Sequence, residues 1–433
     1  MKTRYHKKIE PRISIIFYIA IFTASLLLSA HPTLAQTAPS APAPSAPIPV
    51  FIDELPLSFD VPPVIKDGRT LVPFRAIAEG LRIKVDWNGT TQTVQGTTAG
   101  KTLILNIGNH TAFLNGEAIF LDVPPEINNG RTLIPLRIFS ETLGFQVDWL
   151  DNERMIKIWS PPSHLPVTGF YALGSSGASS WKNLFLKDFP EAEAGNTDIV
   201  NKIALGWYSL DENGYLLTKS ATGWQRPSGW ETVLETAKQY NLKTEMVVHM
   251  TDQNGGLRRL IADSSATRNA VESITNEAVS FYHAVNLDLE GLGWQEQGDT
   301  LSATRHDFSN FVNQLYNELQ KYNLNLTLTL HAPNSAYPGY DYQTLGNCCD
   351  EIIIMAYDYG PKPEPLQLVT AAIEEALQTV PAEKLMLGVS IPGETGNSLR
   401  QKIGIAKRYN LKGIALWRLG LVTPEMWNIL EKR

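Results

Sequence analysis

Cysteine is almost absent from this chain of 433 residues, because only Cys348 and Cys349 occur and they are adjacent. A disulfide between neighbouring residues is strained and rare, so no structural disulfide is expected. Both thiols precede an apolar segment and are predicted to be small, buried hydrophobic residues. The protein must then be stabilised by its hydrophobic cores, and its length allows cores of sufficient size.

Positive charge is also scarce. The formal net charge is −7, and no basic tail or basic stripe occurs. Nucleic acid is therefore a disfavoured partner, because binding to phosphates depends on clustered lysine and arginine. Apolar residues make up 43% and charged residues 19% of the chain, proportions that are typical of folded domains rather than disorder. The length suggests two or three such domains.

Several well-known site motifs are missing. The sequence contains no HExxH pair, no GxSxG and no evident Ser-His-Asp order. No metal site and no cofactor are therefore expected. His249 and His331 each end a predicted strand, and they are interpreted as hydrogen-bonded packing residues, since lone histidines seldom make a metal site.

The first 35 residues are expected to be a targeting segment rather than part of the fold. Positive residues at the start precede an uncharged, mostly apolar stretch over residues 13–30, and small residues follow at 33–35. A signal peptide over residues 1–35 is the main interpretation. An uncleaved anchor stays open, because this stretch is just long enough to cross a bilayer. In both cases the remaining chain is expected to be secreted or associated with the cell envelope.

Residues 36–48 alternate between proline, alanine and serine, a composition typical of a semi-rigid linker. An internal repeat follows. Residues 62–87 and 124–149 share Pro-Pro, Gly-Arg-Thr-Leu, Pro-x-Arg and Val-Asp-Trp in the same order, offset by 62 residues. Within each copy, Asp-Gly or Asn-Gly indicates a hairpin turn.

Each copy is also predicted to contain a short helix and a short strand. The helices are expected at residues 75–81 and 137–143, and the strands at residues 84–87 and 146–149. Two such units are expected to pack into one small α+β domain over residues 49–160.

The doubled pattern resembles the copper amine oxidase N-terminal-like domain, which is common in exported proteins of Gram-positive bacteria. No copper site is implied, because His110 is the only histidine of the segment. Two interpretations stay open. One is attachment to a cell-wall polymer through residues 49–160. The other is a spacer whose arginines tie strands to helices, namely Arg69, Arg131, Arg75 and Arg137.

From residue 165 to residue 433, short apolar runs alternate with helical patterns, which is typical of repeated βα units. Eight such runs predict a (β/α)8 TIM barrel. They are residues 167–172, 203–209, 243–249, 284–290, 324–331, 351–357, 385–391 and 413–419. An open doubly wound sheet is the alternative. It usually carries a Gly-rich phosphate loop after its first strand, and residues 174–177 match such a loop only weakly.

The fourth run carries the main candidate site. Because side chains alternate along a strand, Asn286, Asp288 and Glu290 share one face, which should point into the barrel. Carboxylates inside a closed core are costly unless they have partners or a function. Glu290 ends the strand on the side where barrel active sites form. Gly291 and Gly293 follow and allow the chain to turn into a loop.

This strand resembles the DxxDxDxE signature of family 18 glycoside hydrolases. Glu290 matches the final Glu and Asp288 the preceding Asp, whereas Asn286 and His283 replace the two earlier acids. An Asn at this position resembles the spore-germination and cortex-lytic branch, whose members are linked to bacterial peptidoglycan. The two missing acids are a departure from the family pattern.

The resemblance implies roles for these residues. Glu290 would donate a proton to the leaving oxygen, with a pKa raised by burial and by Asp288. The acetamido group of the substrate would act as the nucleophile. Asp288 would orient that group, and Asn286 is expected to hydrogen-bond Asp288.

Two further matches occur in the expected order along the chain. Met355-Ala356-Tyr357-Asp358 in the sixth run resembles the M-x-Y-D of the family, and Trp417 in the eighth run resembles the Trp that floors the sugar site. The residues expected to be catalytic are Glu290, Asp288 and Tyr357. Those expected to bind substrate are Asn286, Asp358, Trp417 and Met355. Four more aromatics near strand ends are expected either in subsites or in the core, namely Trp294, Trp207, Tyr171 and Tyr337.

The resemblance predicts an exported glycoside hydrolase that cleaves β-1,4 bonds at N-acetylglucosamine in peptidoglycan or chitin-like glycans, with retention of configuration. A non-catalytic, lectin-like cell-wall protein is the alternative, because an upstream Asp of the signature is missing. A structural envelope protein, in which the repeats matter and the barrel is a passenger, is a third hypothesis.

Overall fold

The computed structural model of the protein describes residues 47–98, 100–171, 179–219 and 225–433. The predicted signal peptide over residues 1–35, most of the predicted linker and the weak phosphate-loop match lie outside this range. Within it, no helix combines the length and the apolar character needed to cross a membrane.

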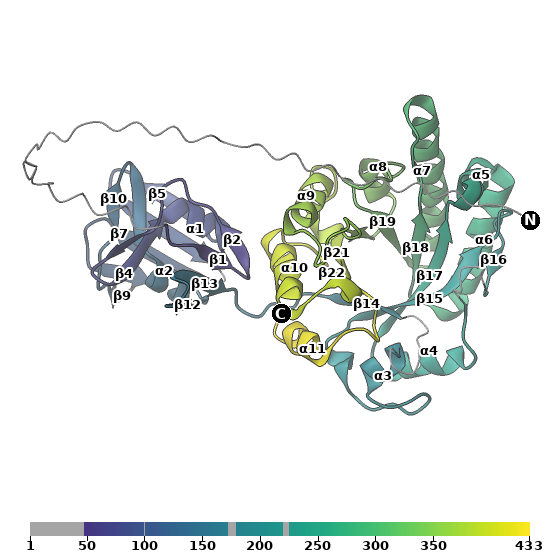
Figure 1. Cartoon of the computed structure of the whole chain (residues 1–433), viewed down its shortest axis with the longest axis horizontal. Helices are drawn as coiled ribbons and strands as arrows, with labels where there is room; N and C mark the ends of the chain where they lie inside the picture. Colours follow the sequence, from purple (N-terminus) through teal and green to yellow (C-terminus); the bar gives the residue numbers. More distant parts are fainter. Residues whose placement is uncertain (1–46, 99, 172–178, 220–224) are drawn as a thin grey trace, which may run out of the picture. The chain divides into compact units, whose positions relative to one another are not determined.

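Eight parallel strands form a ring in the C-terminal part of the chain (Figure 1). They are β14 (Val167–Tyr171), β15 (Lys202–Leu210), β17 (Lys243–Thr251), β18 (Ala284–Glu290), β19 (Asn325–His331), β20 (Glu351–Met355), β21 (Leu385–Ser390) and β22 (Gly413–Trp417). The first strand pairs with both β15 and β22, so the sheet closes on itself. This closure confirms the predicted barrel and excludes the open doubly wound sheet.

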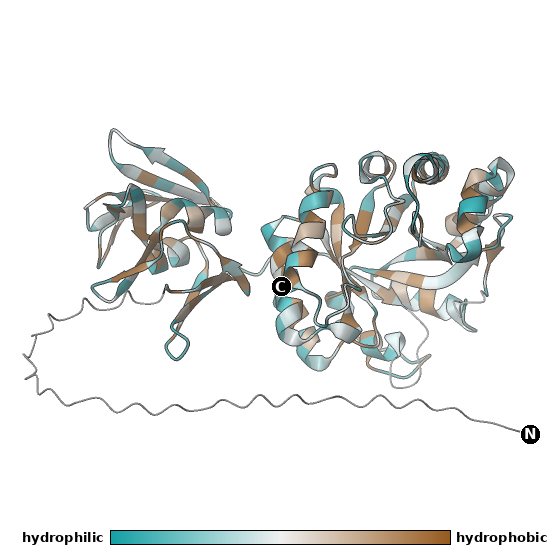
Figure 2. Ribbon diagram, turned by 45° about the horizontal axis from the view of Figure 1, so that its top comes forward, coloured by the Kyte–Doolittle hydropathy of each residue, from teal (hydrophilic) through white to brown (hydrophobic). Residues whose placement is uncertain are grey.

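Helices surround the ring, and the apolar residues coloured brown in Figure 2 run along its strands. The short strand β16 (Leu216–Leu217) pairs antiparallel with β15. The described helices of this part are α3 (Ser180–Phe185), α4 (Trp230–Gln239), α5 (Gly256–Ala262), α6 (Ser264–Phe281), α7 (Gly298–Gln320), α8 (Tyr342–Asn347), α9 (Leu366–Ala376), α10 (Gly396–Arg408) and α11 (Pro424–Glu431). A large apolar core fills the space between strands and helices.

The strand prediction was correct in number and order, and the fourth strand has the predicted bounds. The sixth strand was predicted to reach Tyr357, but β20 ends at Met355. The chain turns locally at this point, because the backbone N–H of Ala356 donates to the carbonyl oxygen of Ile354 at 2.9 Å. Cys348 and Cys349 are buried and unpaired, as expected.

Residues 50–159 hold the two repeats, which build three small sheets around one core. The sheets are β12-β13-β1-β2, β10-β11-β4-β3 and β5-β6-β7-β8-β9. Their strands are β1 (Val50–Ile52), β2 (Leu55–Leu57), β3 (Val64–Lys66), β4 (Arg69–Pro73), β5 (Lys84–Asn88), β6 (Thr93–Thr98), β7 (Lys101–Asn106), β8 (Thr111–Leu114), β9 (Glu117–Phe120), β10 (Glu126–Asn128), β11 (Arg131–Pro135), β12 (Gln146–Leu150) and β13 (Met155–Trp159). The two helices are α1 (Phe74–Gly80) and α2 (Leu136–Thr142).

The predicted hairpin turns are present in both repeats. Asp67 and Gly68 both have positive φ angles, of +49° and +72°, and Asn129 and Gly130 have +48° and +73°. Two positive φ angles in a two-residue loop are typical of a type I′ turn, for which Asn-Gly and Asp-Gly are preferred. The predicted helices and strands of each copy also form, with bounds shifted by one residue.

Gly293, in the loop after the fourth strand, is sterically required. Gly293 has a φ of +82°, and a Cβ added there would lie 2.4 Å from the backbone nitrogen of Gly339. We expect Gly293→Ala to lower the free energy of unfolding by about 1–3 kcal/mol, because both the backbone and the loop must move. Denaturation in urea, followed by tryptophan fluorescence of the full chain, measures this loss.

Gly298→Ala is the matched control. Gly298 also has a positive φ, of +56°, but no atom lies within 4 Å of its added Cβ. Its substitution should therefore cost less than that of Gly293. Equal losses in the two variants would show that the approach of Gly339 does not limit this loop.

Candidate active site

The two carboxylates of β18 lie inside the barrel, as predicted. Asp288 is 3% exposed, and the Glu290 side chain, at the end of the strand, is 29% exposed. Both line a cavity of about 550 Å³ at the carboxyl ends of the strands. Leu289, between them, packs instead in the core formed with the helices.

Six of the seven predicted site residues line this one cavity. They are Asp288, Glu290, Met355, Tyr357, Asp358 and Trp417. They come from β18, from β20 and the loop that follows it, and from β22, so distant segments of sequence meet only through closure of the ring. Trp417 packs edge-to-face on Phe170 of β14, with 5.3 Å between ring centroids.

Asn286 is the exception, because it lies below the cavity and is fully buried. Its amide donates to Glu245 Oε2 at 3.0 Å and accepts from Thr329 Oγ1 at 2.8 Å. The expected hydrogen bond to Asp288 was wrong. Residues two apart on a strand are separated by about 6.6 Å along it, whereas side chains of the neighbouring strands β17 and β19 are closer.

Glu245 connects Asn286 to a buried network of charges. Lys202 Nζ lies 2.8 Å from Glu245 Oε1 and also pairs with Glu351, and Lys412 Nζ lies 2.8 Å from Glu351 Oε1. Burial alone would lower the pKa of Lys202, but the two glutamates raise it. The interior acids below the cavity thus pair with lysines, whereas no lysine pairs with Asp288 or Glu290 among the described residues.

Two histidines contact Glu290. His249 Nε2, from β17, lies 3.4 Å from Glu290 Oε1, and His331 Nε2, from β19, lies 3.7 Å from Glu290 Oε2. The interpretation of both as packing residues was therefore wrong. A signal was present for His331, which follows Thr327 and Thr329 at alternate positions of its strand, whereas His249 follows the apolar Val247.

The electrostatics of the carboxylate pair differ from the expectation. Burial, together with the charge of Glu290, holds the pKa of Asp288 well above its usual range. Burial also favours the protonated form of Glu290, but the hydrogen bond and charge of His249 and the charge of His331 outweigh it, and the pKa of Glu290 is lowered. The expected rise at Glu290 was wrong for this reason. The two shifts have opposite directions, so protonation is favoured more at Asp288 than at Glu290.

Asp288 also has unused hydrogen-bonding capacity. Its Oδ1 is buried and has no hydrogen-bond partner among the described residues. A buried polar atom without a partner is costly, so it is a point where a bound molecule can bring a donor or acceptor.

Backbone clamps hold the cavity walls in place. The hydroxyl of Tyr340 donates to the carbonyl oxygen of Leu289 at 2.8 Å, directly before Glu290. On the other wall, Glu364 accepts from the backbone N–H groups of Asp358 and Tyr359 at 2.9 and 3.2 Å. These contacts fix the chain on both sides of the cavity.

The four additional aromatics divide into two groups. Trp207 and Tyr171 are buried in the core. Tyr337 lines the cavity and stacks on His331 with 4.1 Å between ring centroids, and Trp294, 53% exposed, lies 5.3 Å from the Tyr337 ring. Tyr337 and Trp294 therefore extend the cavity outward as an aromatic wall.

One group of potential metal ligands occurs among the described residues. Donor atoms of His249, Asp288 and Glu290 all lie within 4.8 Å of one another. Imidazole and carboxylate suit several divalent ions. The carboxylates of Asp288 and Glu290 are also the candidate acid–base groups, so metal binding and proton transfer would compete for them.

Comparisons with known proteins agree with this geometry. Residues 179–398, half of the chain, match the family model of Glycosyl hydrolases family 18. The chain belongs to family 18 of the glycosyl hydrolases. Residues 51–158 match the family model of the Copper amine oxidase N-terminal domain.

Individual relatives are more distant. The Cortical fragment-lytic enzyme of Bacillus subtilis is 21% identical over 245 residues, covering 40% of this chain and 55% of that enzyme. The chain thus spans about half the length, or less, of the curated relatives it matches.

Two solved structures show the same fold. A chitinase from Chromobacterium violaceum has 18% identity and a TM-score of 0.51, covering 62% of this chain and 98% of that one. The Bacillus cereus spore cortex-lytic enzyme SleL has 15% identity and a TM-score of 0.51, covering 63% and 75%. At these identities the likeness extends to the fold alone.

The contact between His249 and Glu290 gives a measurable prediction. In His249→Gln the pKa of Glu290 should rise, because a neutral amide stabilises the carboxylate less than a histidine that can carry a proton. The pH range over which Glu290 reacts with a carbodiimide label should then move to higher pH. Mass spectrometry of the peptide that contains Glu290 measures the extent of labelling at each pH.

His306→Gln is the control, since His306 is exposed on α7 and does not line the cavity. It should leave the titration of Glu290 unchanged. An unaltered titration in His249→Gln would mean that this contact does not set the charge of Glu290.

Proposed function

We propose that this protein is a glycoside hydrolase that cleaves β-1,4 bonds next to N-acetylglucosamine in peptidoglycan or chitin-like glycans. The observation that carries the proposal is the pairing of Asp288 and Glu290 on the inner face of β18, in a cavity that also contains Tyr357, Asp358 and Trp417. Cortex-lytic and chitinase relatives in the same family favour a glycan with acetamido groups.

In the proposed reaction Glu290 protonates the leaving oxygen while the bond from this oxygen to the anomeric carbon breaks. The carbonyl oxygen of the substrate acetamido group attacks the same carbon and forms an oxazolinium ion. Water then attacks this carbon and loses a proton to Glu290, so configuration is retained. No separate carboxylate nucleophile is needed.

The proton of the carboxylate pair must move before this reaction. In the free protein the proton favours Asp288. An acetamido N–H placed at Asp288 would stabilise the ionised form of this side chain and drive the proton to Glu290. Substrate binding would in this way produce the reactive protonation state, which the two histidines oppose in the absence of substrate.

The remaining predicted residues have complementary roles in the proposal. The Tyr357 hydroxyl and Asp358 would bind the acetamido sugar, and Trp417 would lie under its apolar face, with Met355 beside it. Asn286 has no direct contact with the cavity, and its proposed role is to position β18 through Glu245 and Thr329.

Export and attachment to the cell wall belong to the same proposal. The N-terminal segment of residues 1–35 has the composition of a signal peptide. Residues 49–160 would attach the protein to wall polymer, ahead of a catalytic barrel over residues 165–433.

Glu290→Gln tests the proposal. We expect hydrolysis of peptidoglycan or of chitin oligomers to fall by about 10²–10⁴-fold, because the amide cannot donate a proton to the leaving oxygen. Binding of the same oligomers should be retained. New reducing ends, identified by mass spectrometry, measure hydrolysis.

Glu272→Gln, which alters an exposed glutamate of α6, is the control and should behave as the unaltered protein. A lectin-like function predicts sugar binding by every form and hydrolysis by none. Absence of both binding and hydrolysis in the unaltered protein would instead indicate a structural envelope protein.

A further inference from the structure

The repeat domain contains two grooves that are related by its internal symmetry. The axis is visible in the pairing of β4 with β11, where Val72 lies opposite Ile134, its own counterpart in the second repeat. Leu71 pairs with Pro135, and Leu133 pairs with Pro73, so exchanging the two repeats converts one pair into the other. Such self-complementary pairing is the internal equivalent of a twofold dimer interface.

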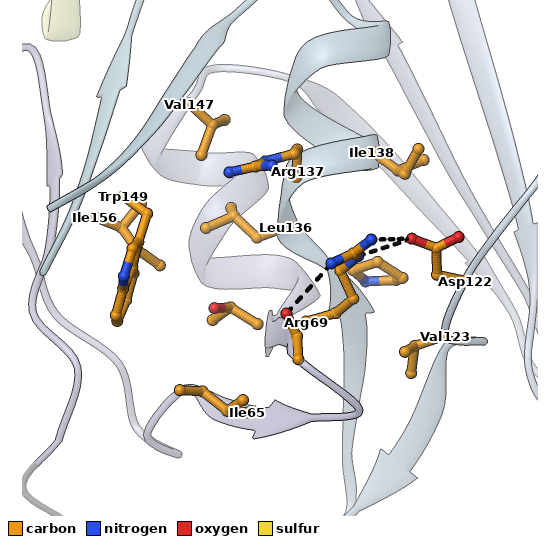
Figure 3. Close-up of a pocket in the computed structure, with 13 residues that line it drawn as sticks. Ile65, Arg69, Asp122, Val123, Leu136, Arg137, Ile138, Val147, Trp149 and Ile156 are labelled. Atoms are coloured by element: carbon orange, nitrogen blue, oxygen red, sulfur yellow. Dashed lines mark hydrogen bonds and ion pairs between the residues drawn. The ribbon is translucent and has the colours of Figure 1, made fainter. Parts of the chain in front are cut away.

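The first groove has a volume of about 440 Å³. It is lined by Arg69 and Thr70 of the first repeat and by Arg137 and Trp149 of the second. Figure 3 shows Trp149 on one side and Arg69 on the other, with Leu136 between them and Arg137 reaching over the space.

The second groove has a volume of about 550 Å³ and exchanges the roles of the repeats. Here Arg131 and Thr132 come from the second repeat, and Arg75 and Trp87 from the first. Each of these residues is the counterpart, 62 positions away, of one that lines the first groove. The two grooves therefore share the same residue types at four equivalent positions.

An exposed ion pair crosses each groove between the repeats. Arg69 Nε lies 2.8 Å from Asp122 Oδ2, and Arg131 Nε lies 2.6 Å from Asp60 Oδ2. The hydrogen bond from Arg131 lowers the pKa of Asp60. The predicted ties from strand to helix were wrong for these arginines, because their partners lie in the segment before the Pro-Pro of the other copy.

These pairs are weak candidates for a purely structural role. All four side chains are at least half exposed, and exposed pairs contribute at most about 1 kcal/mol to stability. A fixed guanidinium and carboxylate side by side offer both donors and acceptors, which suits the hydroxyl and amide groups of a glycan.

The second arginine of each groove provides positive charge. Arg75 makes no ion pair with another described residue. The closest approach of Arg137 to Glu141, in its own helix, is 3.7 Å, and the Arg137 side chain is 57% exposed. A guanidinium in this setting can bind a carboxylate through two parallel hydrogen bonds. Trp87, 44% exposed, offers a flat apolar face beside it.

We infer that these grooves are two equivalent binding sites for a carboxylate-bearing glycan, the peptide-substituted strand of peptidoglycan. The identity of the polymer rests on the proposed function of the barrel. Two equal sites suit a ligand with repeated units, because the second contact forms at high effective concentration once the first is made. Arg75 and Arg137 lie outside the cross-groove ion pairs and support a carboxylate-bearing ligand in each groove, whereas Asp122 and Asp60 balance the charges of Arg69 and Arg131.

The test uses the full chain in a Glu290→Gln background, so that the polymer is not consumed, and measures sedimentation with purified insoluble peptidoglycan. Arg75→Ala and Arg137→Ala should each weaken binding several-fold, and the double variant at least about tenfold, because avidity is lost. Lys84→Ala, which removes one exposed positive charge of β5 outside both grooves, should have no effect.

Chemical variants of the polymer identify the recognised group. Amidation of the peptidoglycan carboxylates should abolish the difference between the double variant and the parent, whereas removal of wall phosphate polymers should not change it. Equal binding by the double variant and the parent, or a dependence on phosphate alone, would overturn the inference.

Hydrolysis of a short soluble chitin oligomer by the chain with Glu290 intact separates this inference from the proposed function. The arginine variants should retain that activity, because they do not alter the barrel. A barrel without activity but with two-site polymer binding would refute only the proposed function. An active barrel with arginine-independent binding would refute only the inference.

Discussion

One proton held between two carboxylates in a closed ring of strands is the constraint on which the site depends. Asp288 and Glu290 point to the same interior, where two negative charges would repel each other with little screening. The fold resolves this by burying Asp288 more deeply, which favours its protonated form, and by placing His249 and His331 against Glu290. Protonation is therefore favoured at Asp288 rather than at Glu290, and in the proposed reaction a bound substrate would move the proton to Glu290.

The rest of the barrel interior supports this arrangement. Below the cavity, Lys202 pairs with Glu245 and Glu351, and Lys412 pairs with Glu351, so ion pairs hold these acids in place. Asn286 joins that network rather than the carboxylate pair. Replacement of an acid by Asn at this position leaves one fewer charge beside Asp288, which is consistent with a site that relies on histidines to balance Glu290.

The repeat domain differs from the barrel because its sequence is duplicated, and the groove therefore occurs twice. Its twofold pairing of β4 with β11 places the Gly-Arg-Thr segment of one copy against the helix and tryptophan of the other. A single copy would present half of each groove. The barrel has one cavity and the repeat domain has two related grooves, a division that suits the proposed hydrolysis of a polymer to which the repeats would also bind.

Periodicity in the sequence determined the eight strands, the inward face of β18 and the turns of the repeats, because these depend on residues that are neighbours in the chain. Six of the seven residues that the family signature identified in advance line the cavity. The tertiary structure alone decided which groups touch. It brought His249 and His331 to Glu290 and directed Asn286 to Glu245. It also paired Arg69 and Arg131 with aspartates of the other repeat. Those contacts join strands far apart in sequence, and both the charge of Glu290 and the shape of the grooves follow from distances that no local pattern contains.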